Sequence, residues 1–315
     1  VRVDHVDGML MPGDYLARLA EQMPHVWVEK ILAEDESLPE SWRVCGTSGY
    51  EFIEKTNALL IDRTGFETIE AFWQTLQPDF RSYKQCMTVA KKEALVNLFP
   101  VELKRVRELG GEGEDFWIEA TAALPVYRTY VSRGSYARED VDMIARVAEQ
   151  TGIEAINTRL SPEDPKNHDI LLEWQQLTGP VMAKGLEDTA HYRYFPLACC
   201  NEVGCEGEPG HPGRSQFEKW VNARAQRYPH TMNCMTTHDT KRSEDARARL
   251  MALADIPQEW ISFVGKARKA GAKFKSGNAP ASHAEYLYLQ NLVASWPGAE
   301  GIDSDYKARI QAYMT

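Results

Sequence analysis

The sequence predicts an α/β protein that is rich in helix overall. Three strand-like runs each end on a carboxylate, and amphipathic patterns fill most of the chain between the second run and the third. The runs are VRVDH at 1–5, HVWVEKIL at 25–32 and TMNCMTTHD at 231–239. The carboxyl ends of parallel barrel strands form the active-site face, so we expect Asp4, Glu29 and Asp239 to lie there. Three carboxylates at such a face are typical of glycoside chemistry.

Residues 1–32 are predicted to form a strand–helix–strand unit. The segment GDYLARLAEQM at 13–23 places apolar side chains at helical spacing. Pro24 ends this helix, and VWV at 26–28 is rich in residues that favour strands. The roughly 25 residues from Asp4 to Glu29 are enough for a crossover between parallel strands. Both carboxylates should therefore emerge at the same end of neighbouring strands.

Residues 55–180 are predicted to form a large, mainly helical inserted subdomain. An apolar stripe runs through a helical stretch at 81–109 and stops at two glycines. PVYRTYV at 125–131 is predicted to be a strand, and helices are expected at 135–152 and 162–179. The flanking parts, 1–54 and 181–315, then hold the barrel portion.

The second flanking part is expected to bring in the THD motif at 237–239. A helix at 216–229 leads into a predicted strand at 231–237. Helices follow the motif, and Thr240 is the candidate N-cap of the first.

Composition excludes some partners. The chain has 315 residues, with 36 Lys and Arg against 46 Asp and Glu, a net charge of −10. It has no basic stripe with interleaved aromatics, so nucleic acid is not expected as a partner. No apolar run approaches the ~18 residues that a membrane span needs, so no membrane partner is expected. The six cysteines are sparse, which favours reduced thiols in a cytoplasmic protein.

No metal and no cofactor are predicted. One alternative is a zinc site made by Cys199, Cys200, Cys205 and His211. Its spacing lacks the paired C-x2-C of structural zinc sites, so we favour ordinary thiols.

Seven strings in order carry a family resemblance. They are RVDHVDG, VEKIL, GTSGYEF, PVYRTYV, VMAKGLEDTAHYRY, NEVG and THDTKRSEDARARL. Together they resemble the maltooligosyl trehalose synthases, a family of the α-amylase clan (glycoside hydrolase family 13). RVD, a glutamate after a strand, and HD are shared across that clan, whereas MAKGLEDTAHYRY and THDTKRSED are specific to the trehalose-forming branch.

The resemblance implies a (β/α)8 TIM-barrel enzyme that needs no cofactor. It would convert the reducing-end α-1,4 linkage of a maltooligosaccharide into an α,α-1,1 linkage by intramolecular transglucosylation with retention. Carried onto this chain, Asp4 matches the nucleophile, Glu29 the general acid/base and Asp239 the third carboxylate. Arg2 and His238 match the clan's usual helpers.

The chain departs from the family pattern at both ends. The early Asp–Asn–His motif, the first three barrel strands and the C-terminal β domain have no counterpart. We therefore expect an internal fragment with about four barrel strands. Such a chain should lack activity by itself, and its open sheet edges favour self-association.

Several side chains have a functional and a structural interpretation. Arg2 would keep Asp4 ionised, or would only close a strand end. Glu29 needs a raised pKa to act as an acid, and Lys30 should point to the opposite face. Further predicted substrate ligands are His5, Lys30, Lys184, Glu187, Asp188, Tyr192, Lys241 and Arg242. A salt-bridged helix would explain residues 184–192 equally well, and Tyr50 and Phe52 either stack on sugar or belong to the core.

Two other functions stay open. A hydrolase or 4-α-glucanotransferase of the same clan would use the same three carboxylates. A non-catalytic helical module would make use of residues 55–180 and would not bring the carboxylates together.

Overall fold

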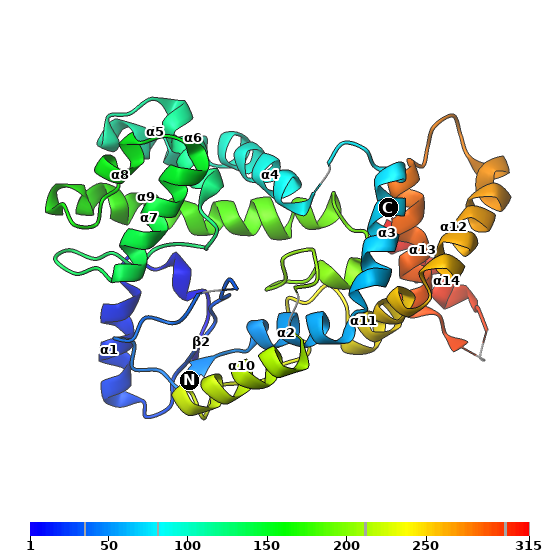
Figure 1. The fold of residues 1–315 in the computed structure, drawn as a ribbon, viewed down its shortest axis with the longest axis horizontal. Helices are drawn as coiled ribbons and strands as arrows, with labels where there is room; N and C mark the ends of the chain where they lie inside the picture. Colours follow the sequence, from blue (N-terminus) through cyan, green and yellow to red (C-terminus); the bar gives the residue numbers. More distant parts are fainter. Residues whose placement is uncertain (35, 81, 211–212, 299–300, 315) are drawn as a thin grey trace. The chain divides into compact units, whose positions relative to one another are not determined.

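A computed structural model describes residues 1–34, 36–80, 82–210, 213–298 and 301–314 (Figure 1). The chain is rich in helix and contains a small parallel sheet of strands β1 (Arg2–Val3), β2 (Trp27–Val28) and β3 (Gly46–Thr47), in that spatial order. Arg2 pairs with Trp27, and Val28 pairs with Thr47. No helix in the described part of the chain is long and apolar enough to cross a membrane.

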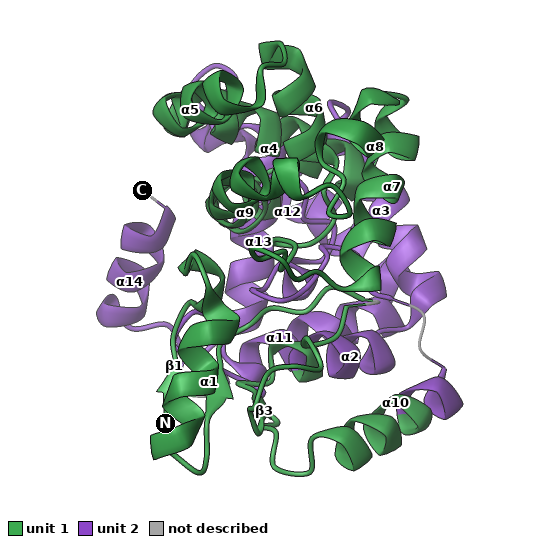
Figure 2. Ribbon diagram, turned by 90° about the vertical axis from the view of Figure 1, so that its left-hand side faces the viewer, with its two compact units in different colours: residues 1–52, 82–193, 218–234 green, residues 53–81, 194–217, 235–315 purple. Residues whose placement is uncertain are grey.

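The chain divides into two compact units (Figure 2). Unit 1 comprises residues 1–52, 82–193 and 218–234, and unit 2 comprises 53–81, 194–217 and 235–315. Helices α2 (Tyr50–Leu60) and α10 (Arg214–Arg227) each contribute residues to both units. The domain division 1–54, 55–180 and 181–315 stays a prediction.

The predicted strand–helix–strand unit is confirmed in unit 1. Helix α1 (Pro12–Gln22) connects β1 to β2, and proline at its first position suits a helix start. Val3, Leu16 and Val28 are buried together in one apolar cluster. Burial of these side chains on both sides of the crossover stabilises the parallel pairing that places Asp4 and Glu29 at adjacent strand ends.

Six helices form the other layer of unit 1. They are α4 (Tyr83–Leu98), α5 (Pro100–Gly110), α6 (Glu114–Ala123), α7 (Arg138–Thr151), α8 (Ala155–Arg159) and α9 (His168–Met182). The long α9 runs through this group (Figure 1), and its Trp174 lies in a cluster with Trp117 and Ile144. The stretch predicted as one helix at 81–109 is two helices, because Pro100 lacks the N–H that would continue the first.

The strand predicted at 125–131 is wrong. Its backbone is bonded to side chains instead of a neighbouring strand: the Gln175 amide accepts from Val131 N at 2.7 Å and donates to Val131 O at 3.0 Å, and Asp140 accepts from Tyr130 N at 2.9 Å. The β-branched and aromatic residues are buried as expected, but the required hydrogen bonds come from α7 and α9.

The strand predicted at 231–237 is also wrong, since no ladder forms there. The start of this segment nevertheless lies beside β3. Met232 N donates to Thr47 O at 3.3 Å, and Thr47 N donates to the Thr231 hydroxyl at 3.1 Å. A side chain thus occupies a position that a strand would fill with a carbonyl. Gly46, at φ 137°, leaves no room for a Cβ against Thr231.

Unit 2 packs α3 (Arg63–Leu76), α11 (Glu244–Met251), α12 (Pro257–Gly271) and α13 (Ser282–Ser295) against one another, and α14 (Ser304–Met314) follows. The predicted N-cap of α11 is wrong by three residues. Ser243 caps the helix by accepting from Ala246 N at 3.4 Å, whereas the Thr240 hydroxyl donates to Thr237 O at 2.9 Å. Thr240 therefore closes the preceding loop.

Candidate active site

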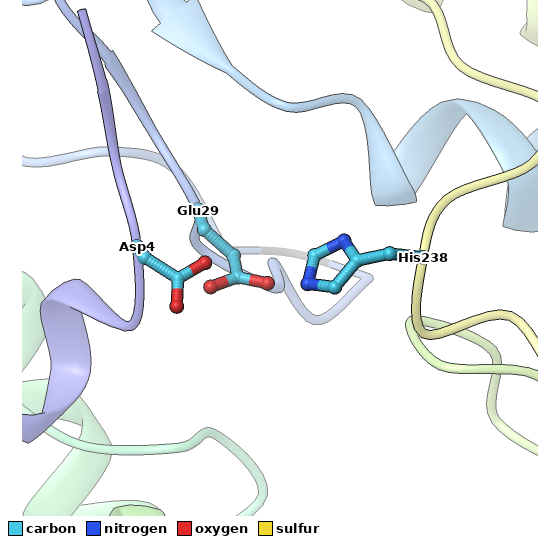
Figure 3. A group of neighbouring side chains, drawn as sticks. All are labelled: Asp4, Glu29 and His238. Carbon is cyan, nitrogen blue, oxygen red and sulfur yellow. The ribbon is translucent and has the colours of Figure 1, made fainter.

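Asp4 and Glu29 follow β1 and β2 directly, and their carboxyl groups face each other (Figure 3). Carboxylate oxygens of the two residues lie within 4.8 Å of each other. Parallel pairing of the two strands produces this approach, because both chains leave the sheet at the same edge. Retaining glycosidases hold their two carboxyl groups ~5–5.5 Å apart, and the close approach of these oxygens is compatible with that arrangement.

Arg2 binds both carboxylates. Its guanidinium contacts Asp4 Oδ1 at 2.7 Å and Glu29 Oε1 at 3.1 Å. Because Arg2 and Asp4 are two residues apart around a strand end, they share one face. One fixed cation therefore holds the two acids in register.

The two carboxyl groups have different surroundings. The Asp4 side chain is 65% exposed and that of Glu29 is 13% exposed. Burial raises the pKa of Glu29 above its usual range, and the hydrogen bond to Asp4 raises it further, while His5 N and Arg2 act in the opposite direction. This is the direction that a proton donor needs.

The turn after Asp4 contributes a backbone donor to this site. His5 has φ 45°, in the left-handed region, and its N–H donates to Glu29 Oε2 at 2.7 Å. Such a conformation is uncommon for a residue with a Cβ. His5 was predicted to contact substrate through its side chain, and its peptide N–H also positions the acid.

Lys30 was predicted to bind sugar, and this role stays a prediction, because its ammonium is engaged in ion pairs within the protein. Its side chain is fully buried and its ammonium lies 2.8 Å from Glu36 and 3.4 Å from Asp7. Asp7 also accepts from the Tyr130 hydroxyl. The ammonium of Lys30 therefore forms ion pairs with buried carboxylates of the protein, not with the carboxylate of Glu29.

The THD motif lies in a loop of unit 2. His238 Nε2 is 3.3 Å from Asp239 Oδ2, with the two side chains 62% and 43% exposed. Asp239 N donates to the Thr237 hydroxyl at 3.2 Å. Both side chains remain accessible, as sugar ligands require.

Arg242, another predicted sugar ligand, is directed into unit 2. Its side chain is 8% exposed, and its guanidinium donates to Ala198 O at 3.2 Å and lies 3.8 Å from Glu202. These contacts occupy its guanidinium inside unit 2, and its role as a sugar ligand stays a prediction. Lys241 donates its backbone N–H to Glu202 at 2.6 Å, and the role predicted for its side chain stays a prediction.

Comparison with known proteins identifies the relatives. No family model matches the chain. A Mycobacterium tuberculosis protein assigned to the maltooligosyl trehalose synthases is 31% identical over 327 aligned residues, which cover 99% of this chain and 41% of that protein. The chain is homologous to a segment of the maltooligosyl trehalose synthases. It spans about two fifths of the length of the curated relatives it matches.

Solved structures agree with this relationship. Maltooligosyltrehalose synthase from Arthrobacter ramosus matches 99% of this chain with 40% of its own, at 34% identity and a TM-score of 0.84. A Sulfolobus tokodaii protein described as a hypothetical maltooligosyl trehalose synthase matches 99% of this chain with 41% of its own, at 28% identity and a TM-score of 0.85.

The string most specific to the synthases continues α9 into a π-helical turn at Ala183–Glu187. Lys184 and Asp188 form an exposed ion pair at 2.7 Å, and Glu187 accepts from the Tyr127 hydroxyl. Tyr192 is 44% exposed. The salt-bridged-helix interpretation accounts for the first pair, and the exposure of these side chains also leaves sugar contact open to test.

Tyr50 and Phe52 resolve differently from each other. Tyr50 is fully buried, which supports the core interpretation, and its hydroxyl donates to Glu29 Oε1 at 3.4 Å. Phe52 packs near Trp220, with ring centroids 6.4 Å apart. Tyr50 is therefore a buried hydrogen-bond donor to the candidate acid Glu29. The sequence pattern did not predict this role.

The six cysteines are free thiols, as expected from their spacing. His211, the fourth residue of the zinc alternative, lies outside the described residues.

Sequence analysis missed two buried charged residues of unit 2, Glu202 and Arg247. Both are fully buried. Glu202 belongs to the NEVG string, so the resemblance marked its neighbourhood without indicating a role. Arg247 follows the THD motif, and nothing in its pattern separates it from Arg249, the exposed arginine of the same helix.

Proposed function

We propose that this chain supplies two catalytic carboxylates and a third sugar-binding carboxylate to a maltooligosyl trehalose synthase. Asp4 attacks the anomeric carbon of the reducing-end linkage, and Glu29 protonates the departing oxygen. Glu29 then deprotonates the anomeric hydroxyl of the released glucose, which attacks the anomeric carbon bound to Asp4 and displaces the Asp4 carboxylate. The new bond is α,α-1,1, and retention follows from two successive displacements.

The observation that supports this proposal is the Asp4–Glu29 pair. Oxygens of the two acids lie within 4.8 Å, both acids bind Arg2, and Glu29 is the more buried of the two and has a raised pKa. Double displacement needs such a difference, with an ionised nucleophile open to the sugar and an acid that holds its proton.

Asp239 and His238 are proposed to bind hydroxyls of the sugar at the cleavage point. A carboxylate there favours the distorted, oxocarbenium-like ring. The parallel β1-β2-β3 sheet, with residues 231–233 beside β3, is proposed as part of a (β/α)8 barrel.

The test replaces Asp4 with Asn in the synthase that carries this segment. The shape is kept and the nucleophile is lost, so turnover should fall more than about a hundredfold while maltooligosaccharide binding is retained. Asp14→Asn on the exposed face of α1 is the matched control. Near-wild-type turnover of Asp4→Asn would exclude this residue as nucleophile.

Product analysis separates the proposed reaction from the clan alternatives. A synthase forms non-reducing trehalosyl ends, whereas a hydrolase or 4-α-glucanotransferase creates fresh reducing ends. The 315-residue chain assayed alone should be inactive beside the Arthrobacter ramosus enzyme, because a partial barrel leaves open edges that favour self-association. Comparable activity of the two would contradict the fragment interpretation. The cytoplasmic location stays a prediction.

A further inference from the structure

The loop that carries His238 and Asp239 is bridged across its two ends by one side chain. Arg247, on α11, donates to Arg242 O at 2.8 Å and to Met235 O. These carbonyls lie seven residues apart, on either side of the THD motif. The planar guanidinium presents several donors in fixed geometry, so it sets the span of the loop.

Glu202 also binds this loop, at its C-terminal end. Its carboxylate accepts from Lys241 N at 2.6 Å and also from the Arg242 backbone N–H. It follows the short helix Ala198–Cys200, whose Ala198 O accepts from the Arg242 side chain at 3.2 Å. Backbone and side chain of Arg242 are thus both fixed to one segment.

The cluster of Glu202, Arg242 and Arg247 is not explained by a contribution to stability. Glu202 and Arg247 are fully buried, yet the ion pair between Arg242 and Glu202 is 3.8 Å long. Glu202 Oε1, Arg242 Nε and Arg247 Nε are buried without a hydrogen-bond partner in the described part of the chain. Well-packed apolar side chains would often stabilise such a site as well or better.

We propose that Glu202 and Arg247 are positioning residues that hold the Asp239 loop in its sugar-binding conformation. The inference rests on the role proposed for Asp239. The third carboxylate must meet a distorted sugar, and a displacement of about 1 Å can cost on the order of a hundredfold in rate. A clamp across the loop limits that displacement without touching substrate.

The first experiment measures hydrogen exchange in the 315-residue chain. Arg247→Lys keeps the charge but cannot reproduce the planar two-carbonyl bridge. We expect exchange in residues 235–242 to rise roughly tenfold, with smaller changes elsewhere in unit 2. Arg249→Lys is the matched control, because Arg249 lies on the exposed face of the same helix and binds carbonyls at 294 and 296. Unchanged exchange in Arg247→Lys would overturn the proposal.

The second experiment measures kinetics in the synthase that carries this segment. Arg247→Lys should lower kcat about 10- to 100-fold and change KM less than about threefold, because the misplaced carboxylate acts mainly in the transition state. Glu202→Gln keeps the shape of the side chain and should show the same pattern more weakly. A rise in KM without loss of kcat would contradict positioning for catalysis.

Asp239→Asn separates the two levels of inference. If it abolishes turnover while both clamp variants stay fully active, the positioning proposal fails and the role of Asp239 stands. If loop exchange rises in Arg247→Lys but neither it nor Asp239→Asn affects turnover, the proposed role of Asp239 fails. If Arg247→Lys does not fold, Glu202→Gln decides by the same exchange and kinetic criteria.

Discussion

Two buried charge clusters lie close in sequence to proposed functional carboxylates, and they have opposite composition. In unit 1, one ammonium, Lys30, lies between the carboxylates of Asp7 and Glu36. In unit 2, one carboxylate, Glu202, interacts with the guanidiniums of Arg242 and Arg247. The first cluster is adjacent in sequence to Glu29, and the second lies behind the loop of Asp239.

The clusters differ in how well their charges are compensated. Burial lowers the pKa of Lys30, but Asp7 and Glu36 outweigh it and the net shift is upward. Burial raises the pKa of Glu202 to about 7, and the arginines only partly oppose this. In the unit 1 cluster the buried charge of Lys30 is compensated by two carboxylates. In the unit 2 cluster the buried charge of Glu202 is only partly compensated, and the charged groups bind backbone atoms of the loop.

The largest expected stability effect breaks the unit 1 cluster. Lys30→Met leaves two buried carboxylates without their cation, which should cost about 3–5 kcal/mol in free energy of unfolding near pH 7. The loss should shrink at acidic pH, where the carboxyl groups become neutral. Urea denaturation of the 315-residue chain measures both values, with the exposed Lys104→Met as control. A loss below 1 kcal/mol would show that the cluster is not compensating as described.

The next effect concerns the pH dependence set by Glu202. Its folded pKa of about 7 exceeds the unfolded value near 4.5, so the folded state binds the extra proton between these pH values. Its contribution to the free energy of unfolding therefore falls as pH rises from ~4.5 to ~7, by on the order of 1–3 kcal/mol.

Glu202→Gln removes this titration. Thermal unfolding of the 315-residue chain at pH 5 and pH 8 should show a larger drop in Tm for the wild type than for the variant. An identical drop in both proteins would remove the contrast between the clusters.

A third prediction tests the acid that the unit 1 cluster adjoins. Glu29→Gln should slow turnover of a maltooligosaccharide far more than turnover of an activated aryl glucoside, since a weakly basic leaving oxygen needs little protonation. Initial rates on the two substrates, in the synthase that carries this segment, give the ratio. Equal losses would argue against Glu29 as general acid.

The smallest stability effect is expected at an exposed pair. Lys184 and Asp188 are 52% and 43% exposed, so Lys184→Ala should change the free energy of unfolding by less than about 1 kcal/mol. A several-fold rise in KM in the synthase would support sugar contact by Lys184. An unchanged KM would leave it as a surface ion pair, in contrast to both buried clusters.

Local pattern predicted the helices better than the strands. Helical periodicity located α1, α7 and α9, and it located α4 and α5 as one continuous stretch. β3 escaped prediction because Gly46 and Gly49 resemble a loop, yet both are needed where residues 231 and 232 approach closely. The run at 125–131 resembled a strand because its side chains are buried, but Gln175 and Asp140 supply its hydrogen bonds.

By itself, the sequence determined that Asp4 and Glu29 would follow neighbouring parallel strands. The length of the connection between them suits a helical crossover, and each carboxylate comes directly after a strand-like run. The tertiary structure decided how charged side chains are used. Lys30 and Arg242 looked like sugar ligands beside the proposed catalytic residues, but their ion partners lie elsewhere in the chain. Glu202 and Arg247 lie far apart in the sequence, and only folding brings both to the loop of Asp239, where a role is proposed for them. Strand direction is a local property, whereas charge compensation depends on long-range neighbours.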